Sequence, residues 1–145
     1  MKVKLLIFFL ISTLSASIAQ KPTIWRGPHG NGNYDETGLL KSWPADGPQI
    51  LWTFDKLGAG FSSPVIADNK IFISGTEDGT GYVYSLSNDG KLLWKVPYGT
   101  EFAESYPGSR STPVIVGNLL YQYSGMGLVT CMDAGNGSIK WKKDM

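Results

Sequence analysis

The sequence contains one cysteine and one histidine among its 145 residues. With Cys131 alone, an internal disulfide and any cysteine-rich metal site are excluded. A lone thiol within an apolar stretch is typical of a small core residue and not of a nucleophile. Cys131 therefore gives no indication of redox or metal chemistry.

An excess of charge of one sign is also missing. The chain has 13 Lys and Arg residues against 12 Asp and Glu residues. Proteins that bind nucleic acids electrostatically gather Lys and Arg on one face or along one helix. We therefore expect no nucleic-acid partner.

A long apolar run occurs only at the N-terminus. Two lysines precede the apolar residues 5–14, and Ser17-Ile18-Ala19 forms a small-x-small cleavage pattern before Gln20. This pattern predicts a secretory signal peptide over residues 1–19. The apolar run is shorter than the roughly 20 residues of a membrane span. We expect an exported protein, periplasmic or extracellular, that begins at Gln20 and keeps no membrane span after cleavage.

Turn formers and aromatic residues are abundant, with 18 Gly, 8 Pro and 12% aromatic residues. Two strings also repeat. Residues 62–72 and 111–121 both read as two polar residues, Pro-Val-Ile, a turn with Asn and an apolar stretch. Further along, residues 88–94 match residues 135–141, and both strings end in tryptophan. The chain therefore contains an internal repeat.

The repeat length indicates the fold. Trp52, Trp94 and Trp141 are separated by 42 and 47 residues, within the period of roughly 40–50 residues of a propeller blade. No segment has a sustained helical period. We predict an all-β fold, a β-propeller of four-stranded antiparallel blades, with about two blades in residues 48–145. A β-sandwich is the competing architecture, but it does not demand a tryptophan at this spacing.

Turn signals divide each repeat into strands. Asp68-Asn69 predicts a turn between two short strands. Asp89-Gly90 and Asn136-Gly137 predict two-residue type I′ hairpin turns that lead into an outer strand. Each outer strand carries one of the three tryptophans, and we expect their rings to pack between blades.

The connection before the second blade is longer than the one before the first. Trp52 and Pro64 are 12 residues apart, whereas Trp94 and Pro113 are 19 apart. Such a connection crosses the face on which the central channel of a propeller opens, and functional residues concentrate on loops of this kind. The longer connection contains the three candidate ligand-binding residues, which are Glu101, Glu104 and Arg110.

Each candidate has two interpretations. Arg110 directly precedes an innermost strand, where it can bind an anionic partner, or it can form a structural salt bridge to Glu101 or Glu104. Glu101 and Glu104 can ligate calcium, or they can be solvated loop carboxylates. We assign no catalytic residue and no metal ligand from the sequence.

Residues 20–47 precede the first repeat and have turn signals but no strong strand. We interpret them as an N-terminal extension that is too short to bury a core of its own. Propellers use 4–8 blades, so two blades leave apolar faces and strand edges uncovered. We therefore expect a truncated chain that is not a stable monomer and that needs the remaining blades as partners.

The repeats resemble those of the PQQ-like β-propeller proteins, the quinoprotein alcohol dehydrogenase-like superfamily. The resemblance rests on residues 85–91 with Trp94 and on residues 131–137 with Trp141. The opening Trp25-Arg26 is similar to one exported bacterial branch of that superfamily. The resemblance implies the fold, but the same blades build quinone-dependent dehydrogenases and a scaffold lipoprotein of outer-membrane protein assembly.

Two functions follow from the resemblance. The first is a binding or scaffold module that takes an unknown protein or small-molecule ligand at the channel face. The alternative is the N-terminal part of a dehydrogenase dependent on pyrroloquinoline quinone (PQQ). In such dehydrogenases a vicinal disulfide and a calcium ion accompany the quinone, and this chain has no Cys-Cys pair. We therefore expect no cofactor in this chain, and PQQ and calcium only where a full propeller supplies the site.

Overall fold

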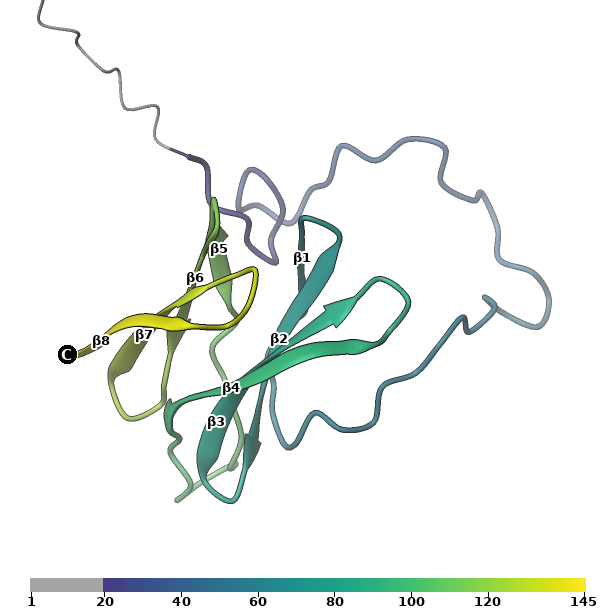
Figure 1. Ribbon diagram of the computed structural model, residues 1–145. Helices are drawn as coiled ribbons and strands as arrows, with labels where there is room; N and C mark the ends of the chain where they lie inside the picture. Colours follow the sequence, from purple (N-terminus) through teal and green to yellow (C-terminus); the bar gives the residue numbers. More distant parts are fainter. Residues whose placement is uncertain (1–19) are drawn as a thin grey trace, which may run out of the picture.

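Eight strands form two four-stranded antiparallel sheets in the computed structural model, which describes residues 20–145 (Figure 1). The predicted signal peptide, residues 1–19, lies outside the described residues. The first sheet consists of β1 (Val65–Ala67), β2 (Lys70–Glu77), β3 (Thr80–Ser87) and β4 (Leu92–Thr100). The second consists of β5 (Val114–Val116), β6 (Leu119–Tyr123), β7 (Leu128–Asp133) and β8 (Ile139–Asp144).

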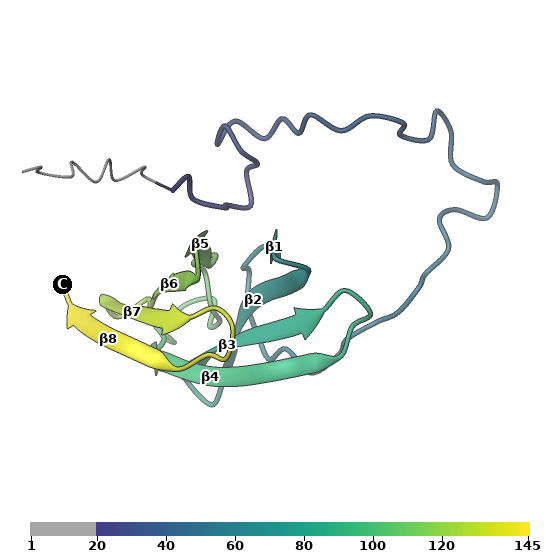
Figure 2. The same cartoon turned by 45° about the horizontal axis from the view of Figure 1, so that its top comes forward.

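Each sheet is a simple meander that corresponds to one sequence repeat. The strand orders are β1-β2-β3-β4 and β5-β6-β7-β8, with every neighbouring pair antiparallel. No helix occurs within residues 20–145. Figure 2 shows β1 and β5 as neighbouring inner strands, with β4 and β8 at the outer edges. The prediction of an all-β fold made of about two propeller blades is confirmed.

The turn at Asp68-Asn69 forms as predicted, but the turns at Asp89-Gly90 and Asn136-Gly137 differ in type from the prediction. Asp68 and Asn69, which join β1 to β2, both have positive φ, 48° and 57°, as a type I′ turn requires. At the predicted Asp89-Gly90 turn only the glycine has positive φ, 81°. The β3–β4 connection is longer than two residues, and the Gly90 amide donates to the Ser87 carbonyl over 2.9 Å.

The turn between β7 and β8 follows the same pattern, since Gly137 has φ of 76° and Asn136 is not in the positive region. The hairpins were therefore predicted correctly but their turn type was wrong. Each hairpin contains a register shift, after Ser85 in β3 and after Cys131 in β7. Such bulged hairpins end in a left-handed glycine after a type I turn.

The core lies within and between the two sheets. Its buried members are Val65, Phe72, Val83, Tyr98, Ile115, Leu120, Met132 and Ala134. Strand β4 of the first blade contacts β7 of the second. The Thr130 hydroxyl donates to the Tyr98 carbonyl over 2.9 Å, which joins these two strands through a buried hydrogen bond.

Two of the three repeated tryptophans lie on outer strands. Trp94 is in β4 and Trp141 is in β8, but residues 48–57 form no strand, contrary to the expectation for Trp52. The reason is that no third strand of a preceding blade lies beside them within the described chain. Trp52 nevertheless contacts the next hairpin, because its Nε1 donates to the Asn88 carbonyl over 2.9 Å.

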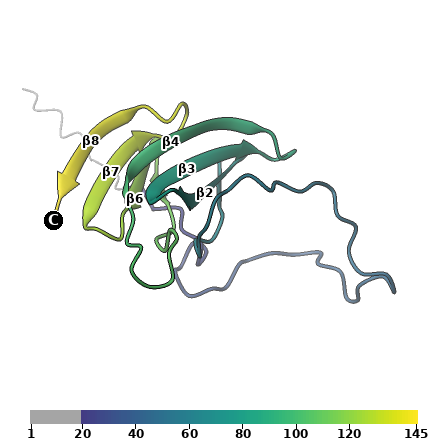
Figure 3. The ribbon, with the colours of Figure 1, turned by 90° about the horizontal axis from the view of Figure 1, so that it is seen from below.

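The N-terminal extension follows the inner edge of the second blade. Thr23 pairs with Ile115 of β5 through two backbone hydrogen bonds of 2.7 and 3.1 Å. The chain then runs far from the sheets before it returns to them, as Figure 3 shows from below. Within residues 20–145, no helix is long and apolar enough to cross a membrane.

Candidate functional site

A cavity of about 440 Å³ opens beside the inner strands, where the N-terminal extension meets the segments that lead into β1 and β5. We name it the inner-face cavity. Its lining combines two arginines with aromatic and small side chains and contains no carboxylate; the residues are Ile24, Trp25, Arg26, Phe61, Ser63, Arg110, Thr112 and Val114. An aromatic wall with cationic groups suits a partner that carries an anionic group.

Arg110 belongs to this lining, at the place where the sequence suggested a ligand contact. Its guanidinium donates to the Ser105 carbonyl and, over 3.0 Å, to the Tyr106 carbonyl. It also lies 5.7 Å from the ring centroid of Phe102. Within the described chain Arg110 forms no salt bridge with either glutamate of its loop. The loop fixes the side chain through neutral groups and leaves its charge uncompensated.

Arg26 supplies the second cation of the cavity. Its guanidinium carbon lies 5.5 Å from the ring centroid of Trp25, and both side chains are exposed. The pairing of Thr23 with Ile115 brings this segment beside the loop that precedes β5. The two arginines, 84 positions apart in the sequence, therefore line one cavity.

Glu101 occupies a different environment from Arg110. Its side chain is 4% exposed, and both carboxylate oxygens are engaged within the protein. The Tyr98 hydroxyl donates to Oε1, and the Gly125 amide donates to Oε2 over 2.7 Å. Glu101 thus links β4 to the β6–β7 connection across the two blades.

Glu104 is exposed on the same loop. The two glutamates that the sequence offered as a calcium pair therefore lie in unlike surroundings, one buried against protein donors and one in solvent. Within residues 20–145, no group of three or more His, Cys, Asp or Glu side chains is placed to hold a metal ion.

A buried polar cluster, which sequence reasoning missed, surrounds Glu101. Tyr98 Oη lies 2.9 Å from Ser109 Oγ, and Ser109 Oγ lies 2.5 Å from Ser74 Oγ. Ser74 also donates to the Ser111 carbonyl over 2.8 Å. Burial and the hydrogen bond to Glu101 raise the pKa of Tyr98, because ionisation would put a second negative charge beside the carboxylate. The cluster fixes the loop that ends at Arg110.

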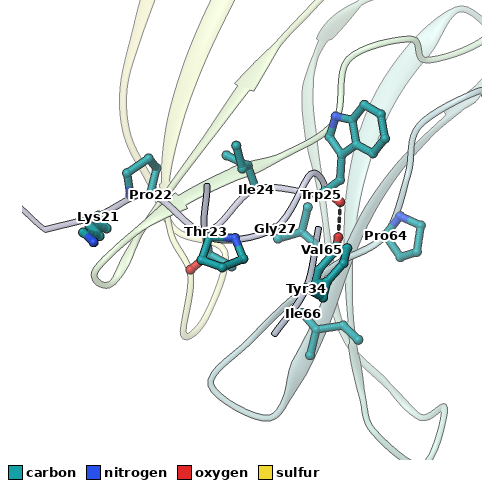
Figure 4. Close-up of a pocket in the computed structure, with 11 residues that line it drawn as sticks. Lys21, Pro22, Thr23, Ile24, Trp25, Gly27, Tyr34, Pro64, Val65 and Ile66 are labelled. Carbon is teal, nitrogen blue, oxygen red and sulfur yellow. Dashed lines mark hydrogen bonds between the residues drawn. The ribbon is translucent and has the colours of Figure 1, made fainter. Parts of the chain in front are cut away.

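A second cleft, of about 340 Å³, lies between the N-terminal extension and β1 (Figure 4). It is largely apolar and includes Ile24, Trp25 and Val65. The Tyr34 hydroxyl donates to the Trp25 carbonyl, which holds the extension in a turn beside this cleft. Ile24 and Trp25 line both hollows.

The repeat geometry and the sequence comparison agree. A family model described as outer membrane protein assembly factor BamB, of the PQQ-like repeat type, matches residues 36–145. The chain belongs to this PQQ-like repeat family. A comparison with curated proteins finds no match.

The position of a residue relative to the PQQ-like repeats decides whether the sequence could indicate it as part of the inner-face cavity. Arg110 was found because the long connection interrupts the repeat. Arg26 and Phe61 lie outside the repeat strings and reach the inner-face cavity only through the fold. One signal in the sequence could have drawn attention to the extension. It is an aromatic residue and an arginine next to a turn-forming glycine, as in Trp25-Arg26-Gly27.

Cys131 lies fully buried in β7. Burial raises the pKa of its thiol, which disfavours the reactive thiolate. The structure therefore places this residue in the sheet core, away from the inner-face cavity.

Proposed function

We propose that this chain is part of an exported propeller that acts as a binding or scaffold module, and that its inner-face cavity takes an anionic group of a protein partner. The observation that carries the proposal is that Arg26 and Arg110 both line a cavity whose lining has no carboxylate. The family description, an assembly factor, supports a protein as the partner.

The expected affinity of this cavity for one carboxylate group is modest. A hydrogen bond to a charged group contributes roughly 1.5–3 kcal/mol, so two contribute about 3–6 kcal/mol at most. This corresponds to dissociation constants between several millimolar and tens of micromolar. Tighter binding needs the aromatic wall of Trp25 and Phe61 and the neighbouring blades of a full propeller.

Export is the second part of the proposal. It is supported by the positively charged start, the apolar run and the small-x-small pattern that ends at Ala19. N-terminal sequencing of secreted material should give Gln20 as the first residue. Secreted protein that retains Met1 would contradict the cleavage.

Binding is tested with a hexaglutamate peptide against a hexaglutamine peptide, by calorimetric titration into the mature chain at low salt. The hexaglutamate peptide should bind and the hexaglutamine peptide should not. The double variant Arg26→Gln with Arg110→Gln should lose binding at least tenfold. Lys56→Gln, which removes an exposed cation outside the cavity, is the matched control. Equal binding by both variants would refute the arginine site.

A further inference from the structure

The second cleft, between the N-terminal extension and β1, presents apolar side chains that the rest of the described chain leaves uncovered (Figure 4). We name it the β1 cleft. Val65 is its buried member, at 2% exposure, whereas Ile66 of the same strand is 64% exposed. Trp25 and Tyr34, on the extension, are 49% and 54% exposed. Apolar side chains that gather around a hollow and remain exposed mark a binding surface.

The extension side of the β1 cleft is held by backbone hydrogen bonds. The Gly27 amide donates to the Ile24 carbonyl over 3.1 Å, and the Gly32 amide donates to the Arg26 carbonyl over 2.9 Å. Gly27 has φ of 78°, and a Cβ there would lie 2.9 Å from the Asn33 carbonyl oxygen. The turn is therefore preorganised, and an apolar group that binds against it pays less for ordering the chain.

The β1 cleft and the inner-face cavity adjoin and carry the same sign of charge. Ile24 and Trp25 line both hollows. Lys21 lines the β1 cleft, Arg26 and Arg110 line the inner-face cavity, and neither lining contains a carboxylate among the described residues. An apolar group in the cleft therefore lies beside cations. Charge complementarity favours an occupant that carries carboxylates next to its apolar group.

The volume of the β1 cleft limits what can enter it. At about 340 Å³ it lies near the lower end of the roughly 300–1,000 Å³ that ligand pockets span. A helix face presents anchors at i, i+3, i+4 and i+7 and needs a long groove. The cleft is instead suited to one large side chain, and its aliphatic members Ile24, Val65 and Ile66 favour a branched aliphatic one.

We propose that the β1 cleft binds one large aliphatic side chain of the protein partner, in a segment where carboxylates on neighbouring residues contact Arg26 and Arg110. This inference names the chemistry of the partner segment and rests on the proposed function of the inner-face cavity. Replacing a buried leucine of the partner by alanine removes three carbons from the cleft, which should lower the affinity about tenfold or more.

The experiment compares three peptides by calorimetric titration into the mature chain, residues 20–145, at low salt. The first has a leucine flanked on each side by three glutamates. The second has alanine in place of the leucine, and the third has glutamines in place of the glutamates. The leucine–glutamate peptide should bind about tenfold more tightly than the alanine–glutamate peptide. It should also bind more tightly than the leucine–glutamine peptide.

A protein variant locates the leucine. Ile66→Asn should reduce the preference for leucine over alanine to less than about threefold, because it replaces an apolar wall of the cleft by a polar one. Leu40→Asn is the matched control and should keep the full preference, since Leu40 is similarly exposed, at 71%, but lines neither hollow. The comparison of peptides on the parent chain needs no variant to fold.

Equal affinities of the leucine–glutamate and alanine–glutamate peptides would overturn this inference and leave the arginine site intact. A leucine preference that persists in Ile66→Asn would also overturn it, because the leucine would then bind elsewhere. Equal affinities of the leucine–glutamate and leucine–glutamine peptides would refute the arginine site itself, and with it the placing of carboxylates beside the cleft. Analytical ultracentrifugation of the chain alone adds one outcome, since a dimer that Ile66→Asn dissociates would assign the cleft to a second copy and overturn the inference.

Discussion

The indole of Trp94, in β4, lies against Gly137 in the hairpin of the following blade. A Cβ on Gly137 would lie 2.9 Å from Cε3 of the indole and 2.7 Å from Cγ2 of Val96. Gly137 has φ of 76°, in the left-handed region. This contact joins the outer strand of one blade to the turn of the next and depends on the absence of a side chain.

Gly137→Ala should destabilise the chain through both the clash and the backbone conformation. Overpacking costs about 1–3 kcal/mol, and the left-handed conformation of a residue with a Cβ costs about 1–2 kcal/mol. Gly79→Ala is the matched control, because Gly79 has φ of 77° but nothing within 4 Å of an added Cβ. Urea midpoints at one fixed protein concentration should fall clearly further for Gly137→Ala. Equal shifts would show that the indole contact contributes nothing.

Glu101→Ala should destabilise the blade interface by roughly 2–4 kcal/mol, because it leaves the Gly125 amide without its acceptor and removes a partner of Tyr98. Glu101→Gln retains an acceptor oxygen and should lose less. Glu104→Gln, on the exposed part of the loop, should stay within about 0.5 kcal/mol of the parent. Urea titration measures the free energy of unfolding of the three variants and so ranks them. A Glu101→Ala variant as stable as Glu104→Gln would exclude a structural role for the buried carboxylate.

Alkaline pH should destabilise the chain through two buried tyrosines. Burial raises the pKa of Tyr84 and of Tyr98, assisted by hydrogen bonds to Glu77 and Glu101 respectively. In the unfolded chain these phenols ionise near pH 10. Their contribution to stability is present below about pH 10 and is lost as the pH rises further, because only the unfolded chain then releases the protons.

The measurement is the urea midpoint at intervals between pH 8 and pH 12, with phenolate absorbance recorded in parallel. Tyr84→Phe and Tyr98→Phe should each flatten the decline above about pH 10. A decline of the same steepness in both variants would assign the alkaline sensitivity to other groups.

The mature chain should not bind PQQ tightly. The quinone carries three carboxylates, and the inner-face cavity offers two arginines, which together support at best a dissociation constant of tens of micromolar. Calorimetric titration with PQQ and calcium measures this directly. A submicromolar dissociation constant that Arg110→Ala abolishes would contradict the expectation and favour the dehydrogenase alternative.

The fold was largely predictable because its signals are local and repeated. The Pro-Val-Ile strings, the glycine turns and the tryptophan spacing each recur, so that two copies support one interpretation. The turn type at Asp89-Gly90 was not predictable from the dipeptide. A bulge at Leu93 in β4 and the ring of Trp52 against Gly90 favour a longer hairpin with one left-handed residue.

The candidate site was predictable only in part. Arg110 was identified because the loop before β5 departs from the repeat length. The burial of Glu101 was not identified, because its partners Tyr98 and Gly125 are set by the packing of β4 on the second blade. Its loop neighbour Glu104 has the same residue type and remains in solvent.

By itself the sequence determined the strand-and-turn repeat and the two blades, because these depend on apolar periodicity and on glycines at fixed offsets. The family follows from the match of residues 36–145 to the PQQ-like repeat. Only the tertiary structure decided which distant residues share a site. Arg26 and Arg110 line one cavity, beside the pairing of Thr23 with Ile115, and Trp52 lies against Gly90 although its segment forms no strand. Such contacts depend on how segments far apart in the sequence are placed relative to one another. The local spacing of residues does not determine that placement.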